Sequence, residues 1–436
     1  MTRIATLAAA LLATAVFAPA AQAQDVAITN ARLVIGDGSA PIDGGTVVVR
    51  GGKVVSAGAG GAPAGMSAID ARGAWVTPGL VAGFSRIGLV EIDAVEGSND
   101  TGATRSPFNA AIDIAPALNP LGSAIAVNRA YGVTRALVYP GSSSGLFRGR
   151  GAVVDLGADR DMLTRGGVFQ YVEFGERGAG QAGGSRAATF LTFRALLQEA
   201  RDYARNPAAY DGRSKDSILL RADAEALARV IDGRDLLFVK ADRAADILNV
   251  VKLKREFAGI RLVLVGAVEG WTVAREIEAA GVPVIAPALN DLPASFEQLA
   301  ATQSNVGRME DAGVTVAIGM VDDWDVHMIH YLTQYAGNLV GLERVPGAAG
   351  LSWDEAFATI SSRPAEIAGM GDVIGSLRPG RVGDVVIWDG DPLELASRPV
   401  AVYIDGVAQP LATRQDRLRD RYATPSEGAL PKAYDR

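Results

Sequence analysis

The chain has only two histidines, and both lie in one stretch that is rich in acidic residues. His327 and His330 are three residues apart, and Asp322 and Asp323 lie shortly before them. Imidazole and carboxylate groups are the side chains that hold catalytic zinc, usually with one position left open for water. Residues three apart share a face of a helix, so this stretch could form a mononuclear metal site.

The same stretch has a second interpretation that needs no metal. Aspartates near the start of a helix are stabilised by the positive end of its dipole, and two histidines can pack beside that helix. Other catalytic classes have less support. The chain has no cysteine, which excludes thiol nucleophiles and zinc-thiolate sites. It also has no H-E-x-x-H or G-x-S-x-G string, and a serine nucleophile would have to recruit a distant histidine.

Composition and charge narrow the class of protein further. Hydrophobic residues make up 49% of the 436 residues, enough for a large core. The formal net charge of −7 argues against nucleic acid or anionic lipid as a general partner. The length predicts one large domain with a smaller satellite domain.

Residues 1–23 have the plan of a secretory signal peptide. Arg3 precedes an apolar run over residues 4–17, Pro19 breaks that run, and Ala21-Gln22-Ala23 supplies an A-x-A cleavage site. We therefore expect a periplasmic or secreted protein with no membrane anchor after cleavage. The apolar run is shorter than the roughly 20 residues that a membrane-spanning helix needs.

The two ends of the mature chain share a β-rich texture. Residues 24–77 alternate apolar strands with Gly- and Asp-rich turns, and Gly51-Gly52 predicts a tight hairpin. The texture returns over residues 375–410, with apolar strands at 385–388 and 400–404. Neither end has enough strands to bury its apolar face alone, so we expect one small composite β-sandwich domain.

Between the two ends, strand-like runs alternate with amphipathic stretches. Apolar runs at 136–139, 236–239 and 261–265 each adjoin a helix-like segment, and the series continues through 282–286 and 314–319. Repeated β-α-β units predict an α/β fold with a parallel sheet. We predict a (β/α)8 TIM-like barrel over residues 78–374, although a doubly wound sheet has the same periodicity. Residues 411–436 are predicted to be a charged C-terminal tail.

Several long strings resemble one known family. Residues 69–88 read IDARGAWVTPGLVAGFSRIG, and residues 363–394 combine Pro-Ala-Glu, Gly-Ser-Leu-x-Pro-Gly, Asp-Val-Val and Gly-Asp-Pro-Leu. These strings resemble the metal-dependent amidohydrolase superfamily, in particular its exported, imidazolonepropionase-like branch. The resemblance implies a hydrolase that acts on C–N bonds of cyclic amides or peptide-like substrates. In that chemistry, bound divalent metal generates hydroxide and polarises the substrate carbonyl.

The resemblance also shows that the family's metal ligands are missing here. The D-x-H-x-H motif of the first barrel strand falls on Phe84 and Arg86 in place of its two histidines. A later histidine position falls on Gly266, and the aspartate of the last strand falls on Met320 or Val321. None of these side chains suits a divalent metal site. By the family pattern we therefore expect no metal and no other cofactor.

Two cations and one aspartate remain as candidate site residues. Lys240 stands where relatives have another histidine, and the resemblance places it with Arg86 at the barrel mouth, where the two could bind an anion. Both could equally pair with local acids such as Glu173 or Asp322. Asp322 is also the candidate catalytic acid or base if the last strand is shifted by one residue.

Two functional hypotheses follow. The first is a catalytically impaired or inactive amidohydrolase-like protein that binds a small-molecule or peptide-like ligand, or that associates with itself or with an active relative. The alternative is an active hydrolase with a remodelled, mononuclear site for a metal such as zinc, built from Asp322, Asp323, His327 and His330.

Overall fold

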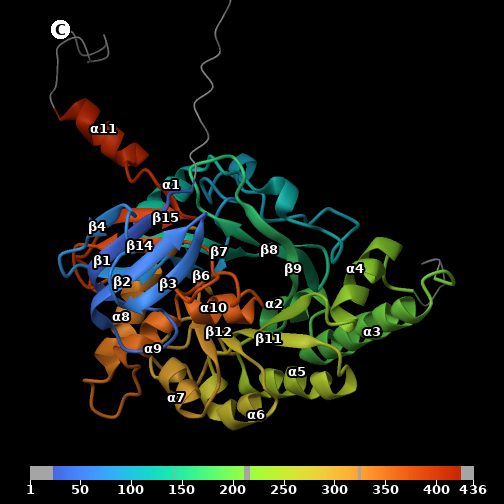
Figure 1. Ribbon diagram of the computed structural model, residues 1–436. Helices are drawn as coiled ribbons and strands as arrows, with labels where there is room; N and C mark the ends of the chain where they lie inside the picture. Colours follow the sequence, from blue (N-terminus) through green and yellow to red (C-terminus); the bar gives the residue numbers. More distant parts are fainter. Residues whose placement is uncertain (1–22, 142, 211–216, 323–325, 424–436) are drawn as a thin grey trace, which may run out of the picture.

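The computed structural model describes residues 23–141, 143–210, 217–322 and 326–423 (Figure 1). All but the last residue of the predicted signal peptide lies outside these ranges, as do Asp323 and residues 424–436. The described chain is a mixed α/β fold with two eight-stranded sheets. We call them the terminal sheet, which both ends of the chain build, and the barrel sheet, which lies between those ends in the sequence.

The terminal sheet joins strands from the two ends of the chain. Its order is β16-β15-β14-β5-β1-β2-β3, with β4 paired to β1. The strands are β1 (Val26–Leu33), β2 (Ile42–Arg50), β3 (Lys53–Ala59), β4 (Ala68–Asp70), β5 (Trp75–Pro78), β14 (Val385–Trp388), β15 (Pro399–Ile404) and β16 (Val407–Ala408). Antiparallel pairing of β14 with β5 connects the two ends. The predicted hairpin between β2 and β3 is present, and Gly51 and Gly52 have the positive φ values of 54° and 76° that its turn requires.

The barrel sheet is nearly closed. Its order is β13-β12-β11-β10-β9-β8-β7-β6. The strands are β6 (Leu80–Ser85), β7 (Val133–Val138), β8 (Phe147–Asp155), β9 (Leu163–Glu173), β10 (Leu236–Ala241), β11 (Arg261–Gly266), β12 (Val284–Ala286) and β13 (Val316–Ile318). Just after β13, the Met320 amide donates to the Phe84 carbonyl at 3.0 Å. That contact brings the last strand beside the first.

One strand differs from the uniform β-α alternation that the sequence predicts. Strand β8 runs antiparallel to both β7 and β9, whereas the remaining neighbours are parallel. The reason is the length of the connections. Only residues 139–146 and 156–162 separate β8 from its neighbours, whereas a parallel crossover needs about a dozen residues or more.

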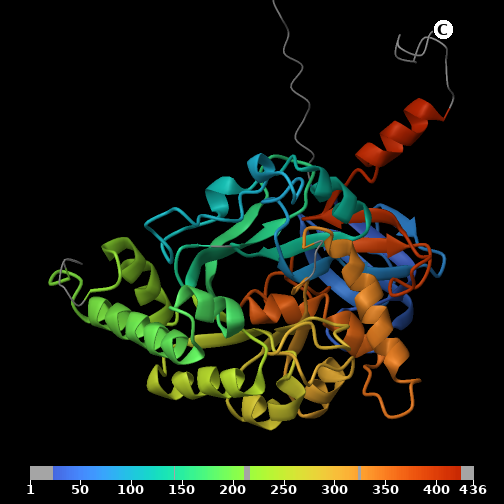
Figure 2. The same cartoon turned by 180° about the vertical axis from the view of Figure 1, so that it is seen from behind.

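Helices surround the barrel sheet (Figure 2). They are α1 (Ser123–Ala130), α2 (Gly175–Gln181), α3 (Arg186–Arg205), α4 (Arg221–Ile231), α5 (Ala244–Glu256), α6 (Ala274–Ala279), α7 (Asn305–Asp311), α8 (Leu332–Leu342), α9 (Trp353–Ala358) and α10 (Ser362–Ile367). Helix α11 (Arg414–Tyr422) extends away from the rest of the fold (Figure 1). Within the described residues, none of the helices is both long and apolar enough to cross a membrane.

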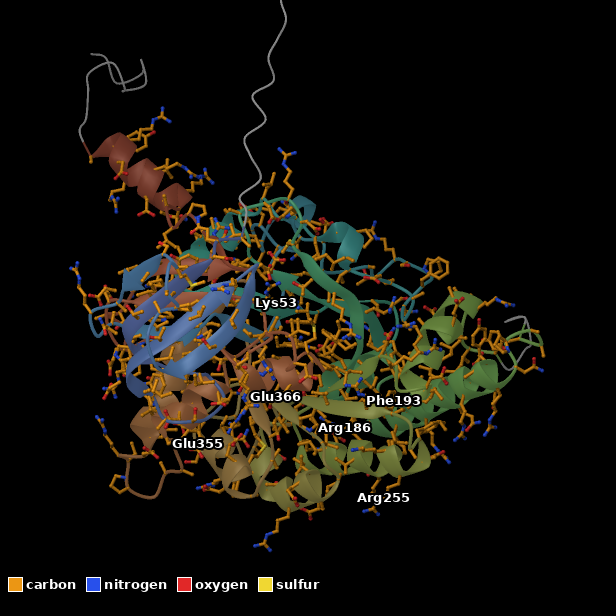
Figure 3. The ribbon with its side chains drawn as sticks, viewed as in Figure 1. Lys53, Arg186, Phe193, Arg255, Glu355 and Glu366 are labelled. Carbon is orange, nitrogen blue, oxygen red and sulfur yellow. The ribbon has the colours of Figure 1, made fainter. Side chains whose placement is uncertain are left out.

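Helix α3 illustrates how the sequence specifies these elements. The Ser185 hydroxyl caps its first turn by accepting from the Ala188 amide at 3.1 Å. Phe193, Leu197 and Ala200 recur at helical spacing and are fully buried. Helix α5 shows the opposite, solvent-facing side of such a helix, because Arg255 near its end lies on the outer surface (Figure 3). The buried stripe packs the helix against the barrel and leaves the polar face to solvent.

A buried arginine ties the two sheets together. Arg135 of β7 pairs with Asp384, which precedes β14, at 2.8 Å, and with Asp405, in the turn after β15, at 2.6 Å. Burial alone would lower the pKa of Arg135, but these carboxylates outweigh it and raise that pKa. Asp155 of β8 lies 3.7 Å from the same guanidinium. Burial raises the pKa of Asp155 to about 6, against the opposing effect of Arg135.

Candidate ligand site at the barrel mouth

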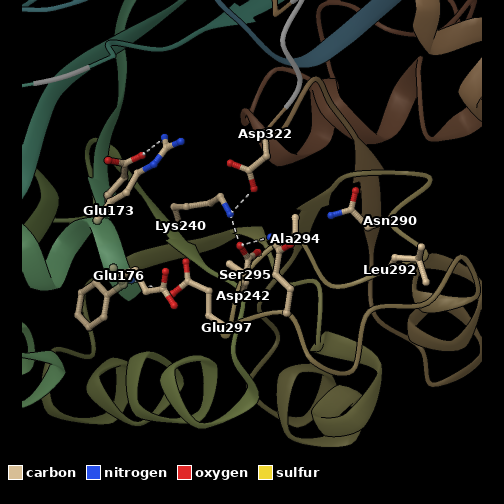
Figure 4. A pocket seen from close by; sticks show the side chains of 13 residues that line it. Glu173, Glu176, Lys240, Asp242, Asn290, Leu292, Ala294, Ser295, Glu297 and Asp322 are labelled. Carbon is tan, nitrogen blue, oxygen red and sulfur yellow. Dashed lines mark hydrogen bonds and ion pairs between the residues drawn. The ribbon is translucent and has the colours of Figure 1, made fainter.

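A polar pocket lies at the carboxyl ends of β9, β10 and β13. Its volume is about 320 Å³, and Figure 4 shows charged side chains from separate strands converging on it. We call it the mouth pocket. The residues that line it are Glu173, Phe174, Glu176, Arg177, Lys240, Asp242, Asn290, Leu292, Ala294, Ser295, Glu297, Gln298 and Asp322.

Lys240 lies between two carboxylates in this pocket. Its ammonium group forms a close ion pair with Asp242 and a second one with Asp322, whose Oδ2 is 2.7 Å from Nζ (Figure 4). Burial alone would lower the pKa of Lys240, but the charges of the two aspartates outweigh it and raise that pKa. Lys240 is therefore a permanently charged ammonium at neutral pH. Its pairing with Asp322 is one of the two outcomes that the sequence left open.

The positions of Lys240 and Asp242 at the end of β10 explain why their side chains meet. Lys240 lies near the end of β10, and Asp242 follows two residues later, so both side chains point to the same side of the strand. The Val268 amide donates to Asp242 Oδ1 at 3.4 Å, and Gln298 Nε2 donates to Asp242 Oδ2 at 3.0 Å. Asp242 is thus held in place from two other segments.

Gly266 leaves the space that Lys240 and Asp242 occupy. It ends β11 with a φ of +87°. A Cβ atom built there would lie 2.2 Å from Asp242 Oδ1 and 2.8 Å from Lys240 Nζ. A histidine at this position is therefore incompatible with the ion pairs, because the lysine side chain already fills its place.

Replacing Gly266 with alanine should destabilise the fold by about 2 kcal/mol or more, since the new methyl group is both overpacked and strained at positive φ. Urea denaturation followed by tryptophan fluorescence measures the loss. Gly341 of α8 is a matched control because nothing lies within 4 Å of a Cβ added there. Its alanine variant should be neutral or more stable by up to about 1 kcal/mol. Equal effects of the two substitutions would contradict the steric argument.

Aromatic rings fill the barrel interior where β6 would carry metal ligands. The fully buried Phe84 ring stacks on Tyr139 with ring centroids 3.6 Å apart, and Tyr171 meets Phe84 edge-on at 5.4 Å. Burial raises the pKa of Tyr139 to about 12, so this phenol stays neutral. The Arg86 guanidinium carbon lies 4.8 Å from the centroid of the Tyr139 ring. Arg86 does not line the mouth pocket, so the structure does not bring it together with Lys240 there.

Glu173, at the end of β9, is the centre of a second ion-pair group. Arg148 of β8 forms a close ion pair with it, and Arg177 of α2 lies 3.5 Å from its Oε1. The Tyr171 hydroxyl donates to the same oxygen at 3.3 Å. Glu173 is therefore compensated within the protein.

The two histidines lie apart from the mouth pocket. His327 precedes the short helix η4 (Ile329–Tyr331), and its Nδ1 is buried without a hydrogen-bond partner among the described residues. His330 Nδ1 lies 2.9 Å from Asn128 Oδ1, and its ring packs against Tyr131 with ring centroids 4.5 Å apart. Neither histidine lines the pocket. The helix face that they were predicted to share is absent, because His327 lies in a turn.

The predicted metal set cannot be placed as a whole. Asp323 lies outside the described residues. Within the described ranges, no group of three or more histidine and acidic residues has an arrangement that could hold a metal ion. Asp322 is the member that reaches the mouth pocket, where it faces Lys240. Met320 and Val321, the alternative positions for the family aspartate, are buried.

Several pocket residues escaped the sequence analysis. Asp242 could have been found, because it follows Lys240 by two residues at a predicted strand end. Phe174, Glu176 and Arg177 follow the end of β9 and were also missed. The remaining residues lie between β12 and α7, in a segment whose described conformation is irregular and which has no periodic pattern. These residues are Asn290, Leu292, Ala294, Ser295, Glu297 and Gln298.

Comparison with known proteins supports one superfamily. Residues 263–408 match a family model described as Amidohydrolase family. The chain is 26% identical to amidohydrolase tasK of Hapsidospora irregularis over 374 residues, which cover 78% of this chain but only 37% of that protein. In structure it is similar to an amidohydrolase from Thermotoga maritima MSB8, with a TM-score of 0.77, 24% identity and coverage of 89% of this chain and 100% of that one.

A more distant structural likeness is to an adenosine deaminase from Xanthomonas campestris with bound zinc. The TM-score is 0.53 at 15% identity, with coverage of 92% of this chain and 100% of that one. Identities in this range show a shared fold only. The chain is thus similar to amidohydrolases over residues 263–408 and shares their fold.

Proposed function

We propose that this protein is an amidohydrolase-like barrel that binds a small ligand at its mouth and does not catalyse metal-dependent hydrolysis. The observation that carries the proposal is the ammonium group of Lys240, held between Asp242 and Asp322. A fixed organic cation is thereby placed at a position where the resemblance expects a metal ligand.

The residues at the family's metal positions do not fit a divalent metal. Phe84 and Gly266 offer no ligating side-chain atom. Lys240 could ligate only as a neutral amine, and the two aspartates raise its pKa. Without metal-bound hydroxide, the family's nucleophile is not formed.

The proposal extends to the finer family and to the location of the protein. The strings over residues 69–88 and 363–394 favour the exported, imidazolonepropionase-like branch and its TIM-barrel and β-sandwich plan. The N-terminal pattern favours export to the periplasm or medium. A barrel that has lost hydrolysis could also be retained as a subunit beside an active relative, which copurification would reveal.

Metal content and hydrolysis together test the proposal. Protein purified from its own compartment should contain substoichiometric zinc, manganese and iron by elemental analysis. It should show no chelator-sensitive turnover on a panel of dipeptides and cyclic amides, with a working zinc amidohydrolase as the positive control. Stoichiometric metal with chelator-sensitive turnover would establish the alternative, a remodelled metal site near residues 322–330.

A further inference from the structure

The lining of the mouth pocket carries more acidic than basic groups. Its five carboxylates and two cations are Glu173, Glu176, Asp242, Glu297, Asp322, Arg177 and Lys240. Both cations are already paired with carboxylates of the lining, and Arg177 lies 3.5 Å from Glu173, which also pairs with Arg148 from outside the lining. A partly enclosed site lined mainly by one sign of charge concentrates ions of the opposite sign. The lining therefore favours a cation over an anion.

Some acidic groups of the lining share one arginine that lies outside it. Arg186 is 3.2 Å from Glu297, 3.7 Å from Glu176 and 3.2 Å from the buried Asp246. Asp246 also pairs with Arg243, at 2.8 Å, so the Arg186 guanidinium is left to balance Glu176 and Glu297. Glu297 also accepts a hydrogen bond from the Glu176 amide at 2.8 Å. This side of the pocket retains an excess of negative charge.

Two residues of the lining also carry buried hydrogen-bond acceptors that the described residues leave unpaired. Gln298 is only 5% exposed, and with Nε2 committed to Asp242, its Oε1 has no partner. The buried hydroxyl oxygen of Ser295 also lacks one. Leaving a buried polar group unsatisfied costs about 1–3 kcal/mol. An amide oxygen can only accept, so the group that completes Gln298 must be a donor.

Asp322 adds a strained carboxylate at the rim. Its φ of +58° is unusual for a residue other than glycine, and such conformations cost about 1–3 kcal/mol and cluster at functional sites. Lys240 takes its Oδ2, while the side chain remains 32% exposed. A carboxylate that is held in place and open to solvent can accept further donors.

We propose that the mouth pocket binds a small organic cation that bears N–H groups, namely a primary amine or a guanidine. Its charge complements the acidic lining, and its N–H groups complement the acceptors at Gln298, Ser295 and Asp322. The volume of about 320 Å³ is at the small end of ligand pockets. The inference rests on the proposed function, because it takes this pocket as a ligand site that works without metal.

Calorimetric titration of the full chain after chelator treatment tests the inference, with agmatine as the probe. Agmatine carries both an ammonium and a guanidinium group, and its dissociation constant should increase with salt. Tetramethylammonium, a cation without N–H groups, should bind at least about tenfold more weakly, because it cannot satisfy the acceptors. Pentanoate and 1-pentanol should not bind measurably at millimolar concentration.

Variants locate the binding. Ser295→Ala should weaken agmatine binding about threefold, since it removes an acceptor that has no other hydrogen-bond partner among the described residues. Gln298→Met should weaken binding about tenfold, since the lost Oε1 acceptor outweighs the lost donor to Asp242. Glu225→Gln on the exposed face of α4 removes a charge away from the pocket and is the matched control. Thermal denaturation verifies that each variant is folded. Should folded Ser295→Ala and folded Gln298→Met both bind agmatine as wild type does, the pocket assignment is wrong.

The outcomes also separate this inference from the proposed function. If metal-free wild type does not bind agmatine, or binds pentanoate equally well, the cation inference is overturned. The proposal that the protein does not catalyse metal-dependent hydrolysis is unaffected by that result. If the protein shows chelator-sensitive hydrolysis, the proposed function is overturned whatever agmatine does. Binding of agmatine by metal-free protein without such hydrolysis supports both.

Discussion

Replacing Lys240 with methionine should destabilise the protein by about 3–5 kcal/mol at neutral pH. The ammonium group is buried between Asp242 and Asp322, and the Asp242 side chain is only 2% exposed. Removing one partner of a buried ion pair leaves an uncompensated charge, which is the costly case. Urea denaturation of wild type and variant, with unchanged slopes, gives the difference in free energy of unfolding.

The pH dependence gives this prediction a signature. The folded-state pKa of Lys240 is raised, so the stability that it contributes is complete below about pH 10 and is lost as pH rises through the folded-state value. Protonation of the carboxylates in acid should narrow the gap between variant and wild type. Lys252→Met, on the exposed face of α5, is the control and should change stability by less than about 0.5 kcal/mol. A loss for Lys240→Met no larger than that of the control would contradict the ion-pair account.

Replacing Arg135 with methionine should cost a similar amount, about 3–5 kcal/mol, because the same physics applies between the two sheets. The Arg135 side chain is 3% exposed and that of its closest buried partner, Asp384, is 5% exposed. The variant would leave the Asp384 carboxylate without its cation and would remove the weaker, 3.7 Å interaction of Arg135 with Asp155. Equilibrium urea denaturation measures the loss.

The control for Arg135 is an exposed pair in the terminal sheet. Arg50 lies 3.9 Å from Asp25, and both side chains are about half exposed. Exposed pairs contribute about 0–1 kcal/mol, so Arg50→Met should be nearly neutral. If Arg135→Met lowered the free energy of unfolding as little as Arg50→Met does, the ion pairs of Arg135 would not stabilise the contact between the terminal sheet and the barrel sheet.

The sequence predicted the elements of the fold better than their direction. The apolar runs at 236–239, 261–265 and 385–388 correspond to β10, β11 and β14, since buried strands show as short continuous apolar runs. The reversed direction of β8 was not predicted, because direction depends on connection length, which periodicity does not report. Antiparallel neighbours on both sides are visible only once the short links at 139–146 and 156–162 are measured.

The candidate site was only partly predictable for a related reason. The family resemblance pointed to Lys240 and Asp322, and the two side chains do meet in the pocket. Asp242 and Gln298 complete the pocket, but Gln298 comes from an irregular segment whose path depends on tertiary packing. Arg86 illustrates the converse. The sequence predicted it on the first barrel strand, whereas it lies just after the end of β6, and the contact of its guanidinium with the Tyr139 ring was not encoded in any spacing.

The reversed strand β8 also bears on how the chain folds. Strands β7, β8 and β9 pair in succession within residues 133–173, so their contacts close only short loops. Closure of the barrel joins β6 to the region just after β13, across residues 84–320. The entropic cost of closing a loop grows with its length, so contacts between residues far apart in the sequence form late in folding. We therefore expect this antiparallel unit to be an early template, on which the parallel strands and finally the closing seam are assembled.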